Sequence, residues 1–461
     1  MISALNPVSR KGLILIVVAI IIIAAGYLGY IYTVPKPTVA KPVKIAILTD
    51  FTLPVLKGQG EASILAIEDI NKTGGILGRR VEYVWLNTMR KVDVAITAYR
   101  KALIEEGAKY VVLEGVSEEM LALMEEGTKL YSQYPHILMY VGMASEVSLK
   151  IINEYDKYKF AFRMFDVDYD ANVRRPYDYF LHARDVLKVS KIAILIEDAA
   201  WTYGAREGFQ ATTKLGDVKQ KPLRELAKEL GLEVVYEAKI AVGEKNFVPI
   251  LETIAARGAQ YIFAMTSWYT DCVTLTKQWA TSAAGDAYLA LYGGPNHWTT
   301  FWDLTGGAAL GVISGVYDIE DFPPVSPYTQ SFIKKMHEKG LRVDMSAHYY
   351  YSLIYHIKAA IEKAGDPDNI DAVIKALEEV EFKGHTILLA PKVFLGEKSP
   401  IFHSYPAYVG FLFQFQGKDK VVNISDPNDP ILLERYPKDL LGKYCHPELA
   451  KPPAELRKQA G

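Results

Sequence analysis

Glycine and serine patterns that could bind a phosphate or supply a nucleophile occur in the chain, but each is incomplete. Gly58-Gln59-Gly60 starts a dinucleotide-binding pattern after a strand-like run, yet Ser63 stands where the pattern requires a third glycine. The segment 115-GVSEE-119 lacks the second glycine of a nucleophile elbow. Neither stretch therefore predicts nucleotide binding or acyl transfer.

Histidines and carboxylates are also spaced unfavourably for a metal site or for acid–base catalysis. His348 and His356 lie eight residues apart on one helix-like segment, whereas a metal-binding pair on a helix requires a spacing of four. Asp168 and Asp170 fall in a predicted loop, where solvation is the ordinary state of a carboxylate. We therefore expect no enzyme activity, no catalytic residue, no metal and no cofactor.

Ser117 is better suited to binding than to catalysis. It opens a helix-like segment, 117–131, directly after the strand-like run 109–115. The start of a helix offers free N–H groups and a partial positive charge, which suit the carboxylate of a small ligand. A plain capping role, with Glu118 and Glu119 complementing the helix dipole, would also explain this serine.

The elements around Ser117 alternate between strands and helices. Five strand-like runs come first, at 44–50, 81–87, 109–115, 136–142 and 160–164. A second series follows at 191–198, 233–239, 260–265 and 287–294. Alternation of this kind is typical of parallel sheets covered by helices on both faces. The sequence therefore predicts an α/β fold with two doubly wound parallel-sheet lobes.

Composition agrees with a large globular protein that does not bind nucleic acid. The chain has 461 residues, half of them hydrophobic, with 52 basic residues against 54 acidic ones. This length is enough for two or three domains, and the charge balance predicts no nucleic-acid partner. The only cysteines are Cys272 and Cys445, so the sequence does not indicate a disulfide scaffold.

The N-terminal region reads as a membrane anchor. No residue from Gly12 to Pro35 is charged, and 13–33 is long enough for a transmembrane helix. Arg10 and Lys11 precede it, which predicts a cytoplasmic tail or leader at 1–12 and an extracellular remainder. A Pro-rich linker at 34–42 follows. We therefore expect a single-pass protein of the cell membrane with its binding part outside.

The junction Arg10-Lys11-Gly12-Leu13 resembles the class III, pilin-like signal of archaeal surface proteins, which is cut after a basic–Gly pair. The resemblance implies cleavage after Gly12, with the apolar helix retained in the mature protein. An uncleaved anchor is the open alternative.

The stretch 44–83 resembles the opening of the type I periplasmic solute-binding proteins of ABC transporters, in the leucine/isoleucine/valine-binding branch. The family pattern D-x-N-x-x-G-G-I-x-G-R/K is matched by Asp69, Asn71, Gly74, Gly75, Ile76, Gly78 and Arg79. These glycines suit a tight reversal from a helix into the next strand, so the pattern identifies a scaffold and not a ligand contact. A weaker resemblance continues to about residue 425.

The resemblance implies three crossovers between the lobes. Lobe one is expected at 43–164 and 317–385, lobe two at 165–316 and 386–430, and a C-terminal tail at 431–461. A ligand would lie in the cleft between the lobes and be enclosed by a hinge motion.

The resemblance also implies a set of ligand-binding residues at strand ends: Ser117, Ala144, Ser145, Tyr203, Trp268 and Tyr269. At two positions the chain departs from the branch, with Lys57 in place of an aromatic residue and Asn296 in place of an acid. We include both in the predicted site. Together they favour a carboxylate-bearing or otherwise polar ligand with a flat part over a plain branched-chain amino acid.

The function that follows is an extracytoplasmic substrate-binding component of an ABC transporter. It would capture an amino acid or a related carboxylate or amide and deliver it to permease subunits that work with cytoplasmic ATPases. The alternative is a membrane-tethered ligand sensor or surface scaffold without transport. The very short segment before Leu13 argues against a signalling domain in the same chain.

Overall fold

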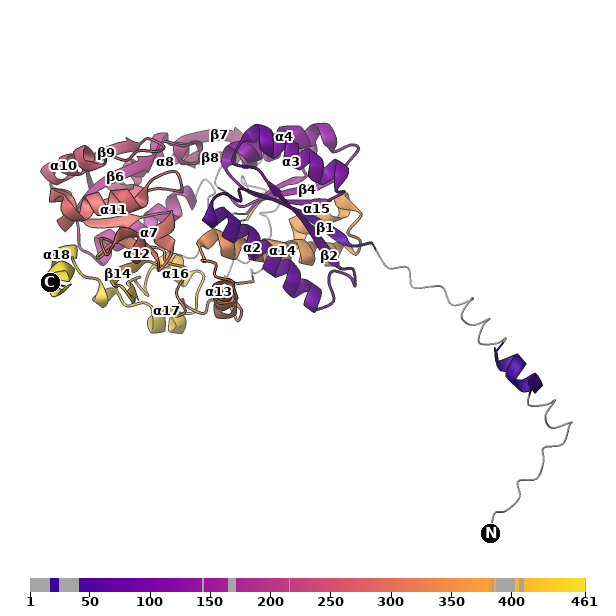
Figure 1. Cartoon of the computed structure of the whole chain (residues 1–461). Coiled ribbons are helices and arrows are strands. Elements are labelled where there is room, and N and C mark those ends of the chain that lie inside the picture. Colours follow the sequence, from indigo (N-terminus) through magenta and orange to yellow (C-terminus); the bar gives the residue numbers. More distant parts are fainter. Residues whose placement is uncertain are drawn as a thin grey trace, which may run out of the picture. The chain divides into compact units, whose positions relative to one another are not determined.

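The computed structural model describes residues 17–24, 41–142, 145–164, 171–214, 216–380, 382, 385–386, 403–405 and 410–460. The chain divides into two units, Met1–Pro42 and Val43–Gly461 (Figure 1). In the first unit, 17–24 is a helix of exposed apolar residues. Most of the predicted transmembrane helix 13–33 lies outside the described residues. Within the described ones, no helix combines the length and the apolarity that crossing a membrane requires. The anchor therefore stays a prediction.

The second unit contains two large sheets. The first has the strand order β13-β5-β4-β3-β1-β2, with all neighbours parallel. Its strands are β1 (Val43–Thr49), β2 (Val81–Asn87), β3 (Tyr110–Glu114), β4 (Ile137–Tyr140), β5 (Ala161–Met164) and β13 (Ser404–Tyr405). The helices α2 (Pro54–Lys72), α3 (Val92–Arg100), α4 (Ser117–Leu130) and α5 (Ser145–Asn153) connect them. This sheet and its helices form lobe one.

The second sheet has the order β15-β14-β12-β11-β10-β6-β9 and is parallel except at β14 and β15. Its strands are β6 (Lys191–Glu197), β9 (Glu233–Ile240), β10 (Tyr261–Met265), β11 (Tyr288–Leu291), β12 (Ile313–Ser314), β14 (Phe413–Gly417) and β15 (Lys420–Asn423). The helices α7 (Ala171–Asp185), α9 (Leu223–Glu229), α10 (Val248–Ala256) and α11 (Cys272–Thr281) accompany it. These elements form lobe two. The predicted α/β fold with parallel sheets is confirmed.

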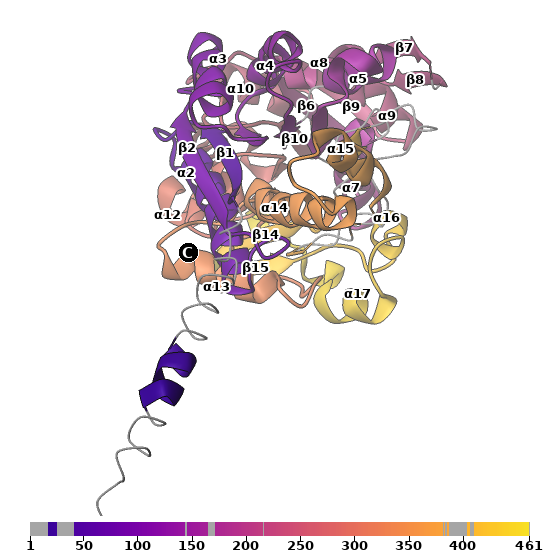
Figure 2. The ribbon, with the colours of Figure 1, turned by 90° about the vertical axis from the view of Figure 1, so that its right-hand side faces the viewer.

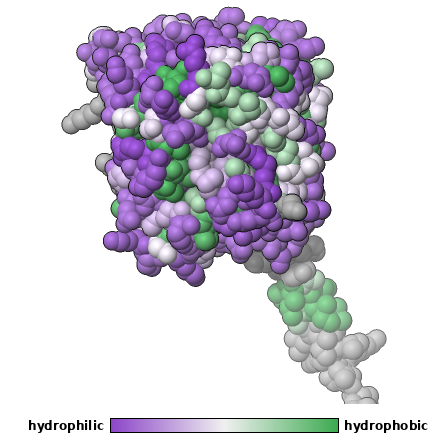
Figure 3. Space-filling model, turned by 90° about the vertical axis from the view of Figure 1, so that its left-hand side faces the viewer, coloured by the Kyte–Doolittle hydropathy of each residue, from purple (hydrophilic) through white to green (hydrophobic). Residues whose placement is uncertain are grey.

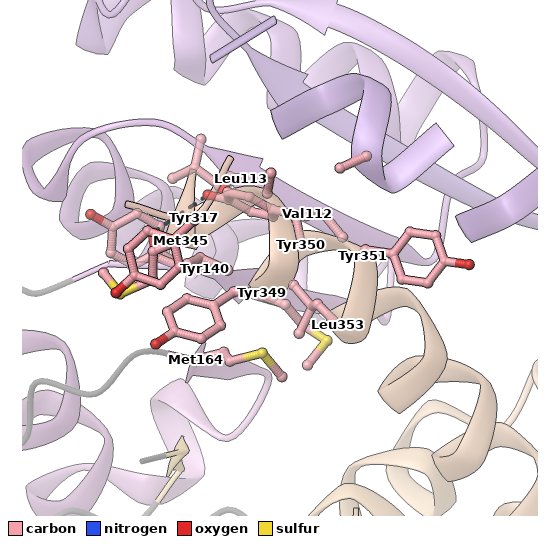
Figure 4. Close-up of a cluster of buried hydrophobic side chains, with 14 of the residues drawn as sticks. Val112, Leu113, Tyr140, Met164, Tyr317, Met345, Tyr349, Tyr350, Tyr351 and Leu353 are labelled. Atoms are coloured by element: carbon pink, nitrogen blue, oxygen red, sulfur yellow. Dashed lines mark hydrogen bonds between the residues drawn. The ribbon is translucent and has the colours of Figure 1, made fainter. Parts of the chain in front are cut away.

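After β12 the chain returns to lobe one through α13 (Thr329–Glu338), α14 (Met345–Ala364) and α15 (Ile370–Glu379). Helix α14 packs along α2 (Figures 1 and 2). Its aromatic face enters the core, where the Tyr350 hydroxyl donates a hydrogen bond to the carbonyl oxygen of Leu113 at 2.6 Å (Figure 4). This contact fixes the start of α14 near the carboxyl end of β3.

The turn between α2 and β2 shows why its glycines are needed. The Gly75 N–H donates to the carbonyl oxygen of Ile70, and Gly74 and Gly75 both have positive φ. The side chain of Asn71 makes two 2.8 Å hydrogen bonds with the backbone of Val81 and so attaches the turn to β2. The turn is structural, as the pattern of glycines indicates.

Three features of the second unit differ from the sequence predictions. Strand β13 pairs with β5 in the sheet of lobe one, whereas the sequence placed 386–430 in lobe two. The region 431–461 is not a plain tail, because it contains α17 (Lys438–Tyr444) and α18 (Pro453–Ala460), and α18 contacts lobe two. An unpredicted hairpin of β7 (Phe209–Thr213) and β8 (Gly216–Gln220) forms a separate sheet.

The outer surface of lobe two is mostly hydrophilic, with apolar side chains gathered in a few narrow areas (Figure 3). Cys272 and Cys445 are both buried free thiols.

Candidate functional site

A cavity of about 160 Å³ lies at the carboxyl ends of strands from both sheets. Lobe one contributes 115–118 after β3, 140–142 at the end of β4, and 344–346 at the start of α14. Lobe two contributes 266–269 after β10 and 292–294 after β11. Ligands of open α/β sheets bind at this edge, so the cavity is the candidate site. A cavity of similar size, about 150 Å³, holds a benzene ring.

The start of α4 gives the cavity a polar corner. The Ser117 hydroxyl lies 3.2 Å from the hydroxyl of Tyr140, so this serine does not cap its own helix. Glu119 takes that role, because its carboxylate accepts a 3.0 Å hydrogen bond from the Val116 N–H. In the described part of the chain, the N–H groups of Ser117 and Glu118 donate to no protein acceptor, whereas that of Glu119 donates to the Val116 carbonyl oxygen at 3.1 Å. The first two can therefore receive an acceptor atom of a ligand. Ser117 is placed where a ligand carboxylate could meet them.

Aromatic rings form much of the wall that lobe two provides. Trp201, Trp268, Tyr269 and Tyr292 all line the cavity. The ring of Trp268 lies 5.1 Å from that of Trp298, centroid to centroid, which supports its position. From lobe one, apolar side chains at the start of α2 complete the wall. The cavity thus combines one polar corner with an apolar, mostly aromatic surface.

Glu197, at the end of β6, holds the aromatic loops in place. Its buried carboxylate accepts hydrogen bonds from the hydroxyls of Ser267 and Thr270, both at 2.6 Å, and from the indole N–H of Trp201 at 2.9 Å. We did not single out this residue from the sequence. An acid that ends a continuous apolar strand is the signal that could have identified it.

Asp344 brings a buried carboxylate to the cavity. It caps α14 by accepting a 2.8 Å hydrogen bond from the Ala347 N–H, and it accepts another at 2.8 Å from the amide of Gln59. Burial raises the pKa of Asp344 to about 6. The charged side chains that line the cavity are this acid, Glu118 and Arg90.

The residues predicted from the sequence fall into three groups. Ser117, Trp268 and Tyr269 line the cavity. Ala144 lies outside the described residues, and so does the side chain of Ser145, which begins α5. Contact with a ligand stays a prediction for all of these.

Lys57, Tyr203 and Asn296 do not line the cavity. Helix α2 begins at Pro54, so Leu53 and Leu56 face the cavity while Lys57 points to solvent. Tyr203 is about half exposed and lines a small neighbouring depression.

Asn296 is fully buried and has a structural role. Its amide group donates to the carbonyl oxygen of Leu291 at 3.2 Å and approaches the Ser314 hydroxyl at 2.6 Å. Its neighbour His297 lines the cavity instead. Neither Lys57 nor Asn296 therefore argues against a branched-chain amino acid.

No metal-binding group emerges either. In the part of the chain that the structure describes, no three His, Cys, Asp or Glu side chains are placed to hold a metal ion. The candidate site is a binding cavity built from hydrogen-bonding groups and aromatic rings.

The fold and this cavity are those of a binding protein with two lobes. The family model described as "Periplasmic binding protein" matches residues 42–409, and the chain belongs to this family. A curated relative, the "Leu/Ile/Val-binding protein homolog 3" of Brucella melitensis, is 23% identical over 317 residues, which cover 68% of this chain and 76% of the relative.

Solved structures show the same fold. The branched-chain amino acid transporter substrate-binding protein LivJ from Streptococcus pneumoniae, in complex with isoleucine, has a TM-score of 0.60 and 14% identity, and covers 83% of this chain and 98% of its own. A solute-binding protein from R. palustris, in complex with 4-hydroxybenzoate, has a TM-score of 0.62 and 15% identity over 84% and 96% of the two chains.

Proposed function

We propose that this protein is the solute-binding component of an ABC transporter and that its solute is a small carboxylate with an apolar body. The observation that carries this proposal is the cavity between the lobes, where the first turn of α4 faces a wall of aromatic rings. The turn suits a carboxylate and the rings suit an apolar or flat group.

The relatives support a solute of this class. The curated relative is named for leucine, isoleucine and valine, and the two solved structures hold isoleucine and 4-hydroxybenzoate. Both molecules combine one carboxylate with a compact apolar part. An amino acid and an aromatic acid are therefore the two kinds of solute to compare.

Transport would then require closure of the lobes and delivery to a permease. The order of the described strands supports three chain crossings between the lobes, since β5 precedes lobe two, α13 follows it, and β13 lies in lobe one before β14 of lobe two. Crossings of this kind can serve as the hinge for closure around a ligand. The uncharged run 13–33 and the linker 34–42 would hold the binding unit at the outer face of the cell membrane.

Titration calorimetry on residues 43–461, which carry both sheets and their cores, tests the proposal. L-isoleucine and 4-hydroxybenzoate are the probes, and glucose is the neutral comparison. We expect one of the two acids to bind and glucose to give no binding heat. Tyr269→Ala should weaken binding at least tenfold because the ring lines the cavity, whereas Tyr203→Ala, outside it, should change affinity less than about twofold. The proposal is contradicted if a folded sample binds neither acid after mass spectrometry has excluded a retained ligand.

A further inference from the structure

The loop between β2 and α3 has an unusual backbone that directs one side chain toward the cavity. Met89 and Arg90 are consecutive non-glycine residues with positive φ, 54° and 51°. Such residues seldom adopt this conformation, and it persists only where the surroundings impose it. Here the Asn87 side chain accepts a 3.0 Å hydrogen bond from the Met89 N–H, and Thr88 accepts one at 3.3 Å from the Arg90 N–H.

A buried acid then orients the Arg90 side chain. The Nε of Arg90 donates to the carboxylate of Asp50 at 3.0 Å, and Asp50 is 1% exposed. Asp50 is itself held by a 2.8 Å hydrogen bond from the Thr52 N–H. Among the described residues, the two terminal amino groups of Arg90 have no hydrogen-bond partner. The guanidinium of Arg90 is therefore held through its Nε, and its two terminal amino groups are available to a ligand.

Arg90 also reaches across the cleft. Its guanidinium carbon lies 5.8 Å from the centre of the Tyr269 ring, within the range of a cation–π contact. Arg90 belongs to lobe one and Tyr269 to lobe two, and both line the cavity. This contact joins the lobes at the site itself.

The same guanidinium lies near the first turn of α4. Burial raises the pKa of Glu119, the residue that caps this turn, and the charge of Arg90 opposes the shift. Arg90 is the one Lys or Arg among the described residues that line the cavity, where the other charged groups are acids. It is therefore the cation placed to meet an anionic group beside the helix start.

We propose that Arg90 is a specificity-determining residue that receives the solute carboxylate together with the first turn of α4. Its contact with Tyr269 couples this recognition to closure of the lobes. The inference rests on the proposed function and deepens it, because it selects carboxylic acids over the corresponding amides. An amide keeps the size and shape of the acid but lacks the charge that a guanidinium pairs with.

Acid and amide pairs test this selectivity directly. The probes are 4-hydroxybenzoate with 4-hydroxybenzamide, and L-isoleucine with L-isoleucinamide, titrated into wild type, Arg90→Gln and Arg90→Lys. We expect Arg90→Gln to weaken acid binding tenfold or more and amide binding less than threefold. Arg90→Lys should be intermediate, since it keeps the charge but not the fork. The matched control is Arg100→Gln, an exposed arginine on α3 that pairs with Glu126 and lies outside the cavity.

Loss of Arg90 leaves Asp50 buried without its cation, so stability must be separated from recognition. The double variant Arg90→Gln/Asp50→Asn removes that unpaired charge, and its melting temperature reports whether the lobe is folded. The role of Arg90 is overturned if this folded variant binds the acids as tightly as wild type does. It is also overturned if the variant's affinities for acid and amide fall by the same factor. If wild type binds neither acid nor amide, the proposed function fails first and the role of Arg90 fails with it.

Discussion

The buried carboxylate of Asp344 makes the stability of the protein depend on pH. Its carboxylate caps α14 but is buried, and burial raises its pKa to about 6 from an ordinary 3.8. The folded state therefore binds the proton more tightly than the unfolded state. Stability from this group is fully present below about pH 4 and is lost as the pH rises through 6.

We predict that Asp344→Asn stabilises the protein at pH 7.5, by up to about 3 kcal/mol, because asparagine keeps the helix cap without a buried charge. The advantage should vanish near pH 4, where the aspartate is protonated. Urea unfolding at both pH values, with wild type alongside, measures the difference. A variant less stable than wild type at pH 7.5 would contradict the cost assigned to the buried charge.

Single residues of the site were predictable only where a local rule identifies them. Ser117 follows a strand and opens a helix, so its place at the cavity was visible in the sequence. Arg90 was not visible, because two strained backbone conformations and a partner 40 residues away direct it. Lys57 and Asn296 lie outside the cavity lining because the orientation of a side chain depends on where its helix or turn begins, which the sequence does not fix to the residue.

At the scale of elements, the turn after α2 offers a matched pair of glycines. Both have positive φ, but a Cβ on Gly75 would overlap the carbonyl group of Arg79, whereas one on Gly74 would meet no atom within 4 Å. We predict that Gly75→Ala lowers the free energy of unfolding by about 3 kcal/mol or more. Gly74→Ala should lower the free energy of unfolding by about 1 kcal/mol, because only the positive φ is unfavourable for alanine there.

Chemical denaturation of the two variants, followed by far-UV circular dichroism, separates these effects. Solute affinity should be unchanged in whichever variant folds, because the turn lies outside the cavity. Equal losses from both glycines would show that steric overlap is not what selects glycine at Gly75.

Long apolar strands could be predicted from the sequence, and short pairings could not. β3 is buried throughout and β1 is buried from Ile45 to Thr49, as is typical of parallel strands between two helical layers. β13 has two residues, and its pairing with β5 is decided by tertiary structure. Strand β7 alternates half-buried and exposed residues without a strong apolar period, so the sequence of its hairpin with β8 resembles a loop.

At the scale of the whole molecule, the C-terminal segment 451–460 packs on lobe two and connects two parts of it. The backbone of Lys451 makes two hydrogen bonds, at 2.8 and 3.0 Å, with the buried amide of Gln414 in β14. Arg457 of α18 donates to the carbonyl oxygen of Gly285 at 2.6 Å, and its guanidinium lies 5.8 Å from the ring of Trp279. The segment therefore connects β14 at one side of the sheet with the region after α11.

Deletion of 451–461 should consequently destabilise the molecule while leaving the cavity residues in place. It removes the two hydrogen bonds between Lys451 and the Gln414 amide, a loss of about 1–3 kcal/mol, and it exposes Trp279 and the apolar surface that Leu456 covers. We expect a total loss of about 3–5 kcal/mol by urea unfolding, with solute affinity within about threefold of wild type at low temperature. Arg457→Gln keeps the backbone contacts and should lose no more than about 1 kcal/mol. If the truncated protein is as stable as wild type, residues 451–461 contribute nothing to stability, as expected of the C-terminal tail that the sequence predicts from residue 431.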